Sequence, residues 1–595
     1  MPSNRVLNQA SSAVALTLFL LAGCNAIVGL DKIQVTDEVA DPDAGASAGG
    51  KADPDAGSGG KLVGKAGGPA SDGGNGGNSG STIIEQQGGD GGVIEVPLGD
   101  CTSNQQCVDR LSGADAGAAG APSATKVPAV CVRKPIPHCE ALLSEDCHTV
   151  TGDYLNDQAI VIGSLFSTTG PTAATNLPRQ QSAALAVEQI NDAGGIPGGS
   201  TSANGRPLVM VSCDETALLV RAATHLVDDL HVPAIVGPNT SQDTLDVSTK
   251  VTVKAGTVVM SPTGVASSIA NLSDDDLTWL MVPSDIQRAP LMINQINAIE
   301  TQIKADDSSK ANVKLGIVFR NDALGNGTRQ GLDNLILNGK SIADAYNLNT
   351  YVKIDPYNGA DPDQQAIVTK YLTFKPDIIV LAGTAEAITK VMVPLEAQWP
   401  AADPRPQYVL IDSTKVPELL TATTGAGNDD LRHRIRGTGI TPGPTGMNTP
   451  AETFTAFQLD YSVRYGASAT ISGMGPAHDA AFAIGCALAA TRTQEVSGSS
   501  VKEGLRKLAG GATKLKASGQ NVLLAFQKLA AGEKITAVGT FGMLDWDVNG
   551  AVQGGTLEIW CIAGPSTKPA YASSGLNFDV KTQTKSGTYV QCKDN

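Results

Sequence analysis

The sequence predicts an α/β protein with two doubly wound parallel-sheet lobes, preceded by a disordered linker and a small disulfide-rich segment. Three observations predict this architecture. From about residue 157, short apolar runs of strand length alternate with longer segments of helical period, and the alternation supplies enough strands for two sheets. Residues 41–92 consist mostly of Gly, Ala, Ser, Asp and Pro. Five cysteines then follow within residues 101–147.

The first residues are expected to be an export signal. The apolar run over residues 13–22 has the length of a signal-peptide core and is too short to span a bilayer. The box Leu21-Ala22-Gly23-Cys24 resembles the bacterial lipoprotein signal, which implies lipidation of Cys24 after removal of residues 1–23. An ordinary signal peptide with a chance cysteine is the alternative. Asn25 favours, by the same resemblance, a lipid anchor in the outer membrane of the cell envelope.

The segment 24–100 is expected to be a tether. The pentapeptide DPDAG occurs in it twice, and much of the chain's total of 66 glycines lies near its front. Such a composition buries too little apolar surface to offset the entropy of ordering the chain. We therefore expect the folded part of the chain to be attached to a membrane through this tether but not to lie on the membrane surface.

The charge of the chain excludes some partners. The formal net charge is −16 at pH 7, and no basic face is visible in the sequence. Nucleic acid and anionic lipid surfaces both require such a face, so we expect neither as a partner. After the signal no stretch approaches 18 apolar residues, so no membrane-spanning helix is expected.

The ten cysteines of an exported chain predict disulfides. With Cys24 assigned to the lipid, at least one thiol must stay free. The cysteine-rich segment, residues 101–150, is too short to build a core unaided, and its connectivity is open. Cys147 is expected to reach Cys213 at the end of a strand. The remaining expected disulfide cysteines are Cys101, Cys107, Cys131, Cys139, Cys561 and Cys592.

Cys561 and Cys592 are expected to tie the C-terminal tail, residues 566–595, to a strand, which leaves Cys486 as a buried thiol in an apolar helix. A zinc site in the cysteine-rich segment is the competing interpretation. It lacks a CxxC pair, and His138 and His148 have no matched spacing, so we expect no metal and no cofactor.

The strands of the two sheets are short apolar runs. We expect them at residues 160–166, 208–213, 234–237 and 258–261 for one sheet, and at 315–319, 378–382 and 409–412 for the other. One lobe should comprise residues 157–283 and 443–540, and the other residues 284–442 and 541–565. Ligands of doubly wound folds bind at the carboxyl ends of strands, which places the site between the lobes.

Seven short motifs in sequence resemble the type I periplasmic binding proteins of the leucine/isoleucine/valine-binding kind. They are TGP at 169–171, AVEQINDAGGI at 186–196, IVGPNTS at 235–241, VMSPT at 259–263, LGNG at 324–327, PDII at 376–379 and GMLDWDVNG at 542–550. The resemblance covers residues 157 to about 565. It implies an extracytoplasmic protein that serves an ABC transporter.

The resemblance also implies a set of ligand-binding residues. In the family the loops after two strands of the first lobe hold the ligand carboxylate. Hydroxyls at a helix N-terminus suit this role, although they could merely cap helices. In the second lobe Asp412 is a candidate partner for a ligand ammonium, or a helix cap before Lys415. The expected set is Thr169, Gly170, Thr240, Ser241, Ser261, Thr263, Gly264, Thr384 and Asp412.

One departure from the family concerns the pocket wall. Members that bind aliphatic amino acids line it with aromatic residues, whereas here the nearest candidates are Phe166 and Trp546. The ligand is then smaller, more polar or not an amino acid, or no ligand binds. Enzyme motifs are absent or incomplete: Ser499 and Lys502 have SxxK spacing but no KTG or SDN partner, so no enzyme is expected.

The function that the sequence predicts is that of a lipid-anchored solute-binding protein. It would capture a small molecule, such as an amino acid or a similar small carboxylate, and present it to an ABC-type importer or a sensor. The alternative is a surface recognition lipoprotein that retains the fold without transporting a small ligand.

Overall fold

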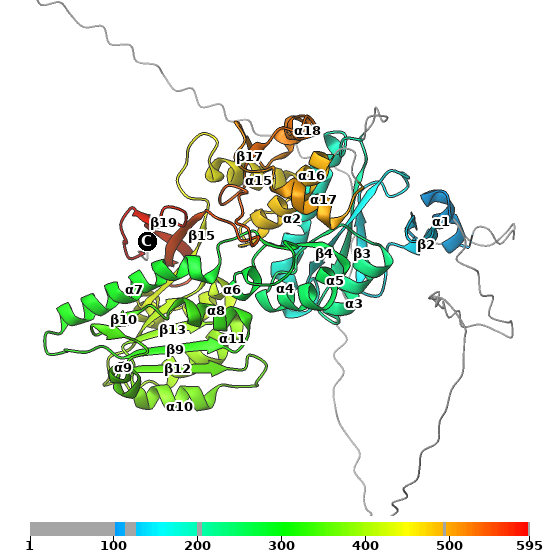
Figure 1. Cartoon of the computed structure of the whole chain (residues 1–595). Coiled ribbons are helices and arrows are strands. Elements are labelled where there is room, and N and C mark those ends of the chain that lie inside the picture. Colours follow the sequence, from blue (N-terminus) through cyan, green and yellow to red (C-terminus); the bar gives the residue numbers. More distant parts are fainter. Residues whose placement is uncertain (1–100, 114–125, 199–204, 492–494, 593–595) are drawn as a thin grey trace, which may run out of the picture. The chain divides into compact units, whose positions relative to one another are not determined.

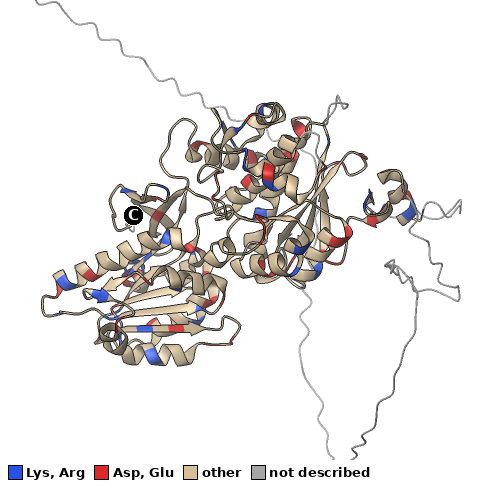
Figure 2. Ribbon diagram, in the orientation of Figure 1, with Lys and Arg blue, Asp and Glu red and all other residues tan. Residues whose placement is uncertain are grey.

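The computed structural model describes residues 101–113, 126–198, 205–491 and 495–592. Cys24, the signal and the predicted tether lie outside the described residues. Within the described part of the chain, no helix combines the length and the apolar character needed to cross a membrane. Figure 2 shows both signs of charge scattered over the described helices and strands.

The first lobe is built on a six-stranded sheet with helices on both faces (Figure 1). The strands are parallel except β3, which lies antiparallel to β5 at one edge. In spatial order they are β3 (Cys147–Thr151), β5 (Leu208–Asp214), β4 (Ile160–Phe166), β6 (Ala234–Val236), β7 (Val258–Ser261) and β8 (Thr278–Leu280).

The helices of the first lobe come from two separate parts of the chain. The first part supplies α2 (Ala173–Asp192), α3 (Leu219–Thr224), α4 (Ser241–Val247), α5 (Val253–Ala255) and α6 (Ser267–Ala270), with the π-helical turns η2 (His225–Asp229) and η3 (Ser248–Thr252). The second part returns with α15 (Pro450–Tyr465), α16 (Met474–Thr491), α17 (Gly498–Leu505) and α18 (Val522–Ala530). A small parallel pair accompanies them, β16 (Thr513–Lys516) with β17 (Ile535–Val538).

Helix α16 holds the second of these two parts, α15 to α18, in the first lobe. Nearly every side chain of this helix is buried, and it packs against α2 in one core with the sheet residues Phe166 and Met260. Leu544, Trp546 and Val552 lie in the same core. The sequence predicts that residues 541–565 belong to the second lobe, whereas Leu544, Trp546 and Val552 pack in the first.

The second lobe is built on an eight-stranded sheet. Its first five strands are parallel and its last three antiparallel. In spatial order they are β12 (Val352–Tyr357), β9 (Leu315–Arg320), β13 (Ile378–Ala382), β14 (Gln407–Leu410), β15 (Ile435–Thr441), β18 (Thr556–Ala563), β19 (Ala570–Asp579) and β20 (Thr584–Ser586). The residues expected to form a C-terminal tail therefore extend this sheet by two strands.

Helices cover the second sheet on both faces, and two separate hydrophobic cores fill the space beneath them. The longer helices are α7 (Asp285–Asp306), α8 (Ala323–Gly331), α9 (Ala345–Thr350), α10 (Gln365–Phe374), α12 (Val393–Gln398), α13 (Pro417–Ala422) and α14 (Asp429–His433). Shorter pieces are α11 (Ala385–Ala387), η4 (Ile388–Met392), η5 (Asp412–Thr414) and the hairpin β10 (Ile336–Leu337) with β11 (Lys340–Ser341).

The cysteine-rich segment consists of α1 (Asn104–Leu111) and an antiparallel hairpin, β1 (Ala129–Val132) with β2 (His138–Ala141). Two disulfides hold it together, Cys101–Cys131 and Cys107–Cys139. The structure also contains the two longer-range pairs proposed from the sequence, Cys147–Cys213 and Cys561–Cys592. Cys486 is a buried free thiol, and burial raises its pKa.

Candidate functional site

The loops that follow β6 and β7 contain five of the residues predicted to bind ligand. Gly237 follows β6 with a φ of +100°, and a Cβ there would lie 2.1 Å from the carbonyl oxygen of Leu165. Only glycine allows the loop to leave the sheet so close to the neighbouring strand. The turn brings Thr240 and Ser241 to the N-terminus of α4, beside the loop after β7.

Ser261 is fully buried and its hydroxyl is already used inside the protein. Its Oγ donates to the carbonyl of Pro238 at 2.7 Å and accepts from Thr244 Oγ1 at 2.9 Å and from the amide of Gly264 at 3.1 Å. These bonds join the two loops to each other. Ser261 therefore shapes the loops rather than pointing a free hydroxyl into the space between the lobes.

Ser241, the first residue of α4, also uses its hydroxyl to join the two loops. Its buried Oγ accepts from the amides of Val265 and Ala266 at 3.0 and 3.1 Å. Backbone N–H groups that a carboxylate could have used are thus satisfied by a serine. Thr240 is exposed and caps α4, accepting from the amide of Asp243 at 3.0 Å. Thr263 is partly buried and donates to the carbonyl of Asn239 at 2.7 Å.

Thr169 and Gly170 lie on the loop after β4 and are exposed. Thr169 Oγ1 donates to the buried carboxylate of Asp214 at 2.5 Å, and Thr216 Oγ1 donates to the other carboxylate oxygen at 2.5 Å. Burial by itself would raise the pKa of Asp214, but these hydrogen bonds outweigh it and lower the pKa. Asp214 is therefore a charged anchor for this loop.

Thr384 follows β13 in the second lobe and belongs to a polar cluster. Its Oγ1 donates to Glu386 and accepts from Arg320 Nη1 at 3.1 Å. Arg320 also pairs with Asp322 at 2.6 Å. Burial would raise the pKa of Glu386, but the hydrogen bonds from Thr384 and the charge of Arg320 lower it. This cluster fixes the carboxyl ends of β9 and β13.

Asp412 is the predicted partner for a ligand ammonium. Asp412 is the first residue of η5, and the cap position before it is Ile411, so Asp412 is not the helix cap that the alternative expects. Instead Oδ2 lies 3.8 Å from Arg288 Nη1 and accepts from the amide of Ile440 at 3.4 Å. The buried Oδ1 has no hydrogen-bond partner among the described residues. Asp412 thus keeps acceptor capacity that the protein does not use.

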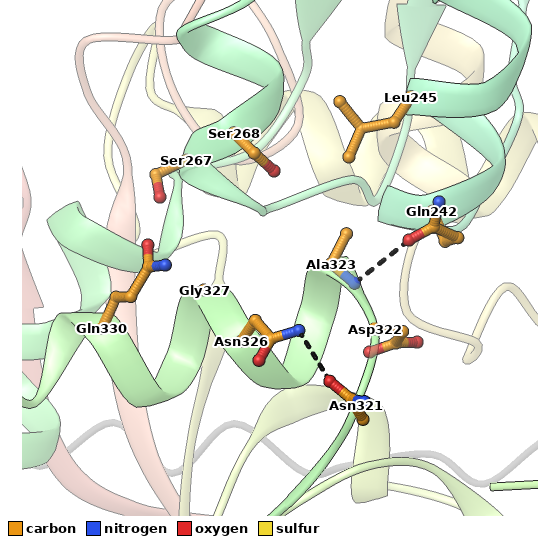
Figure 3. Close-up of a pocket in the computed structure, with 10 residues that line it drawn as sticks. All are labelled: Gln242, Leu245, Ser267, Ser268, Asn321, Asp322, Ala323, Asn326, Gly327 and Gln330. Atoms are coloured by element: carbon orange, nitrogen blue, oxygen red, sulfur yellow. Dashed lines mark hydrogen bonds between the residues drawn. The ribbon is translucent and has the colours of Figure 1, made fainter. Parts of the chain in front are cut away.

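A cavity of about 330 Å³ lies between the two lobes, near these loops. Figure 3 shows Leu245, Ser267 and Ser268 of the first lobe on one side, and Asn326 and Gln330 of α8 on the other. The remaining lining residues are Gln242, Asn321, Asp322, Ala323 and Gly327. The amide of Ala323 donates to Gln242 Oε1 at 3.3 Å and thereby joins the lobes.

None of the nine residues predicted to bind ligand lines this cavity. The closest in sequence is Ser241, which precedes the lining residue Gln242. The sequence does indicate the α8 wall of the cavity, because the family-like motif at 324–327 contains the lining residues Asn326 and Gly327. A second cavity of about 290 Å³ shares Asn321 and Asp322 with the first and is also lined by Arg320, Asn358, Gly359, Ala360 and Glu386.

The predicted aromatic candidates do not contribute to either cavity wall. Phe166 is fully buried in the core of the first lobe. Trp546 packs edge to face on Trp279, with 5.2 Å between ring centroids, and donates its indole N–H to the carbonyl of Leu280 at 2.9 Å. Both residues stabilise the lobe. The cavity lining is accordingly polar, with hydroxyl and amide groups and one carboxylate, Asp322.

Buried charges lie where the chain enters the second lobe. Asp285 begins α7, and burial raises its pKa well above the ordinary value; its Oδ2 has no hydrogen-bond partner in the described residues. Burial also lowers the pKa of Arg288, one turn further along, against the opposing charges of Asp412 and Asp285. These groups lie at the start of α7, where the chain passes from the first lobe to the second.

Comparisons with known proteins identify the family. The family model described as periplasmic binding protein matches residues 159–521. No curated protein matches the chain. Among solved structures, the isoleucine complex of the branched-chain amino acid transporter substrate-binding protein LivJ from Streptococcus pneumoniae is 20% identical, with 70% of this chain and 99% of that chain covered and a TM-score of 0.49.

Two further structures have similar coverage. The leucine-binding protein LivK from Thermotoga maritima is 13% identical, with 70% of this chain and 98% of that chain covered and a TM-score of 0.48. A periplasmic binding protein type 1 from Bordetella pertussis is 17% identical, with 70% and 100% covered and a TM-score of 0.49. Because the family match spans more than half of its 595 residues, this chain belongs to the periplasmic binding protein family.

Proposed function

We propose that this protein captures a small polar molecule, such as an amino acid or another small carboxylate, between its two lobes. Its family is one of extracytoplasmic binding proteins, which makes solute binding its general role. We further propose that Cys24, which lies outside the described residues, carries a lipid anchor in the outer membrane. The captured solute would then pass to an ABC-type importer or a sensor.

The observation that carries the proposal is the cavity of about 330 Å³ with lining residues from both lobes. Its volume is within the range of sites that enclose small molecules. A ligand that touches Ser268 on one side and Gln330 on the other has contacts that exist only when the lobes are close. Such a ligand binds the closed form better than an open one, and this difference in affinity is what drives closure.

The lining supports a polar ligand over an aliphatic one. Side chains of serine, asparagine and glutamine dominate the wall, and each offers both donors and acceptors. Asp322 is the one charged group in the cavity lining. Asp412, which follows β14 in the same sheet, has a buried carboxylate oxygen without a hydrogen-bond partner among the described residues. Both suit a ligand that carries an ammonium group. Thr240, Thr263, Thr384 and Asp412 do not line this cavity, so we propose them as contacts only for a part of the ligand that extends beyond it, and the other predicted residues as support for the loops.

The test is a thermal-shift screen of the full chain against amino acids and small carboxylates, followed by calorimetry with the best compound. A ligand at 100 times its dissociation constant stabilises the fold by about 2.7 kcal/mol. The variants Ser268→Trp and Gln330→Trp place a bulky ring in the cavity from either side and should each weaken binding at least tenfold. Gln302→Trp, on the exposed face of α7, is the matched control and should bind normally.

One observation favours the alternative, a surface recognition lipoprotein without a small ligand. The hydroxyls of Ser241 and Ser261 are both occupied by internal hydrogen bonds. If no compound in the screen stabilises the chain, this alternative is favoured. If a compound binds both tryptophan variants as tightly as the parent, the ligand binds outside the cavity. The lipid anchor is tested separately, since Cys24→Ser should move the protein from the membrane fraction to the soluble one.

A further inference from the structure

We propose that Glu140, His225 and Asp229 bind one divalent transition-metal ion, for which Zn²⁺ is the first probe, and that this ion fastens the cysteine-rich segment to the first lobe. Glu140 comes from strand β2 of the segment, and the other two residues come from the π-helical turn η2 of the lobe. One ligand atom from each of the three residues lies within 4.8 Å of the other two. The inference does not depend on the proposed solute-binding function.

The distances suit a metal centre after small side-chain adjustments. In a tetrahedral site with bonds of 2.0 to 2.1 Å, neighbouring ligand atoms are roughly 3.3 Å apart. Asp229 Oδ2 is already 3.0 Å from His225 Nδ1. Asp229 has a half-exposed side chain and Glu140 a partly buried one, so both carboxylates can adjust.

The histidine is held as a ligand histidine would be. His225 is buried, and its Nε2 lies 3.3 Å from the carbonyl oxygen of Leu142. Metal-binding histidines usually donate their other ring N–H to a carbonyl or carboxylate, which fixes the tautomer and the ring orientation. With Nε2 as the donor, the lone pair of a neutral ring is on Nδ1 and faces Asp229. A lone pair and a carboxylate in contact require a proton or a cation between them.

The charge balance of the cluster also favours a cation. No lysine or arginine among the described residues forms an ion pair with Glu140 or Asp229. A divalent ion would neutralise both carboxylates, whereas a protonated His225 supplies only one positive charge.

The donor set indicates which ions fit. One imidazole with two carboxylates suits Zn²⁺ and its first-row neighbours, and three protein ligands leave a position for water. Calcium prefers six to eight oxygen ligands, which this cluster does not offer. The other candidate metal cluster, Cys101, Cys107 and Cys139, is excluded because all three sulfurs are in disulfides.

The sequence predicts no metal, because the cysteine-rich segment lacks a CxxC pair and His138 and His148 lack a matched spacing. The partners of Glu140 lie instead in the first lobe, far along the chain. The packing that brings them together is independent of any ion, since Leu142 of the segment is fully buried in a core with Leu226 and Val227. The metal would add a second link between the cysteine-rich segment and the first lobe, next to this apolar contact.

The experiment is calorimetric titration of ZnCl₂ into the full chain after treatment with a chelator. We expect one ion per chain. Asp229→Asn and Glu140→Gln should each weaken binding at least tenfold and remove the rise in unfolding temperature that Zn²⁺ causes in the parent. His148→Gln is the matched control, because His148 is an exposed histidine of the same segment that contacts the carbonyl of Glu145.

Asp229 is on the surface, so its variant should fold even if a change at the buried His225 does not. Circular dichroism of the metal-free proteins checks this. Replacing Zn²⁺ with Co²⁺ should give visible ligand-field bands without a thiolate charge-transfer band, which excludes Cys486 as a ligand. Failure to bind Zn²⁺, or equal affinity in the parent and in the Asp229→Asn variant, would overturn the proposal and leave His225 as a protonated bridge.

Discussion

Glu215 is buried directly after β5, at the edge of the first lobe where ligands of such folds bind. Ser167 Oγ donates to its Oε1 at 3.2 Å, and its Oε2 has no hydrogen-bond partner among the described residues. Burial raises the pKa of Glu215 to about 8, and the charge of Asp243 adds to the shift. At neutral pH this side chain is therefore an uncharged acid.

The raised pKa predicts a dependence of stability on pH. Between the ordinary value of 4.5 and about 8, the folded protein holds a proton on Glu215 that the unfolded chain has released. Stability from this group is fully present below pH 4.5 and is lost as pH rises through 8, at about 1.4 kcal/mol per pH unit. Glu215→Gln should remove this component.

The measurement is urea unfolding of the parent and the variant at several pH values between 5 and 8. The difference in unfolding free energy should grow in favour of Glu215→Gln as the pH rises. Glu533→Gln, at a half-exposed residue that pairs with Lys528, is the control and should leave the slope unchanged. Parallel curves for the parent and Glu215→Gln would show that Glu215 is ionised in the folded protein.

Ser261 is a residue whose role differs from the one its motif predicts. Because its hydroxyl satisfies Thr244, Gly264 and Pro238 in a buried loop, Ser261→Ala should destabilise the fold by about 1 to 3 kcal/mol. Denaturant unfolding without ligand measures this. Ser586→Ala, at an exposed residue of β20, is the control. A variant of normal stability that has lost ligand affinity would restore Ser261 as a direct ligand contact.

At the scale of elements, the end of the chain is the largest departure from expectation. β18 pairs antiparallel with β15, and β19 and β20 continue the sheet beyond it. Trp560 of β18 is fully buried, donates its indole N–H to the carbonyl of Thr438 at 3.2 Å and packs edge to face on Tyr571 of β19. The Cys561–Cys592 bond then ties the last described residue to the middle of β18.

This disulfide has a predictable energetic effect. It closes a loop of 31 residues, which in the chain-entropy model stabilises the fold by about 3 to 4 kcal/mol. The double variant Cys561→Ser/Cys592→Ser should therefore unfold at correspondingly lower denaturant concentration. Peptide mapping without reduction checks the pairing in the parent. A disulfide that contains Cys486 would contradict the scheme.

At the scale of the whole molecule, the chain passes between the lobes at three places. After β8 it enters α7, after β15 it returns to α15, and after Val552 it enters β18. The last crossing lies beyond residue 541, where the sequence predicts that the chain re-enters the second lobe, because Leu544 and Trp546 are held in the first-lobe core. Three connections side by side are a usual basis for hinge motion of two rigid bodies.

A ligand in the cavity should therefore compact the molecule. Small-angle scattering of the full chain, with and without the best compound from the screen, should show a smaller radius of gyration in its presence. The Gln330→Trp variant should show no change at the same ligand concentration. Tight binding without compaction would place the site outside the space between the lobes.

The sequence by itself determined the class of the protein and several of its buried strands. The runs at 160–166, 258–261 and 378–382 match β4, β7 and β13, because a buried parallel strand is a continuous apolar segment readable from its own residues. The odd number of cysteines left after Cys24 likewise required a free thiol, and the apolar surroundings of Cys486 made it the candidate.

The tertiary structure alone decided which polar groups meet. Gln242 and Asn326 line one cavity although they belong to different lobes, and Glu140 faces His225 although they belong to different segments. It also decided that the hydroxyls of Ser241 and Ser261 bind their own loops. Hydrophobic periodicity and turn motifs depend on residues that are close in sequence. These contacts join residues far apart in the chain, so they depend on how whole sheets and helices pack, which a local sequence pattern does not reveal.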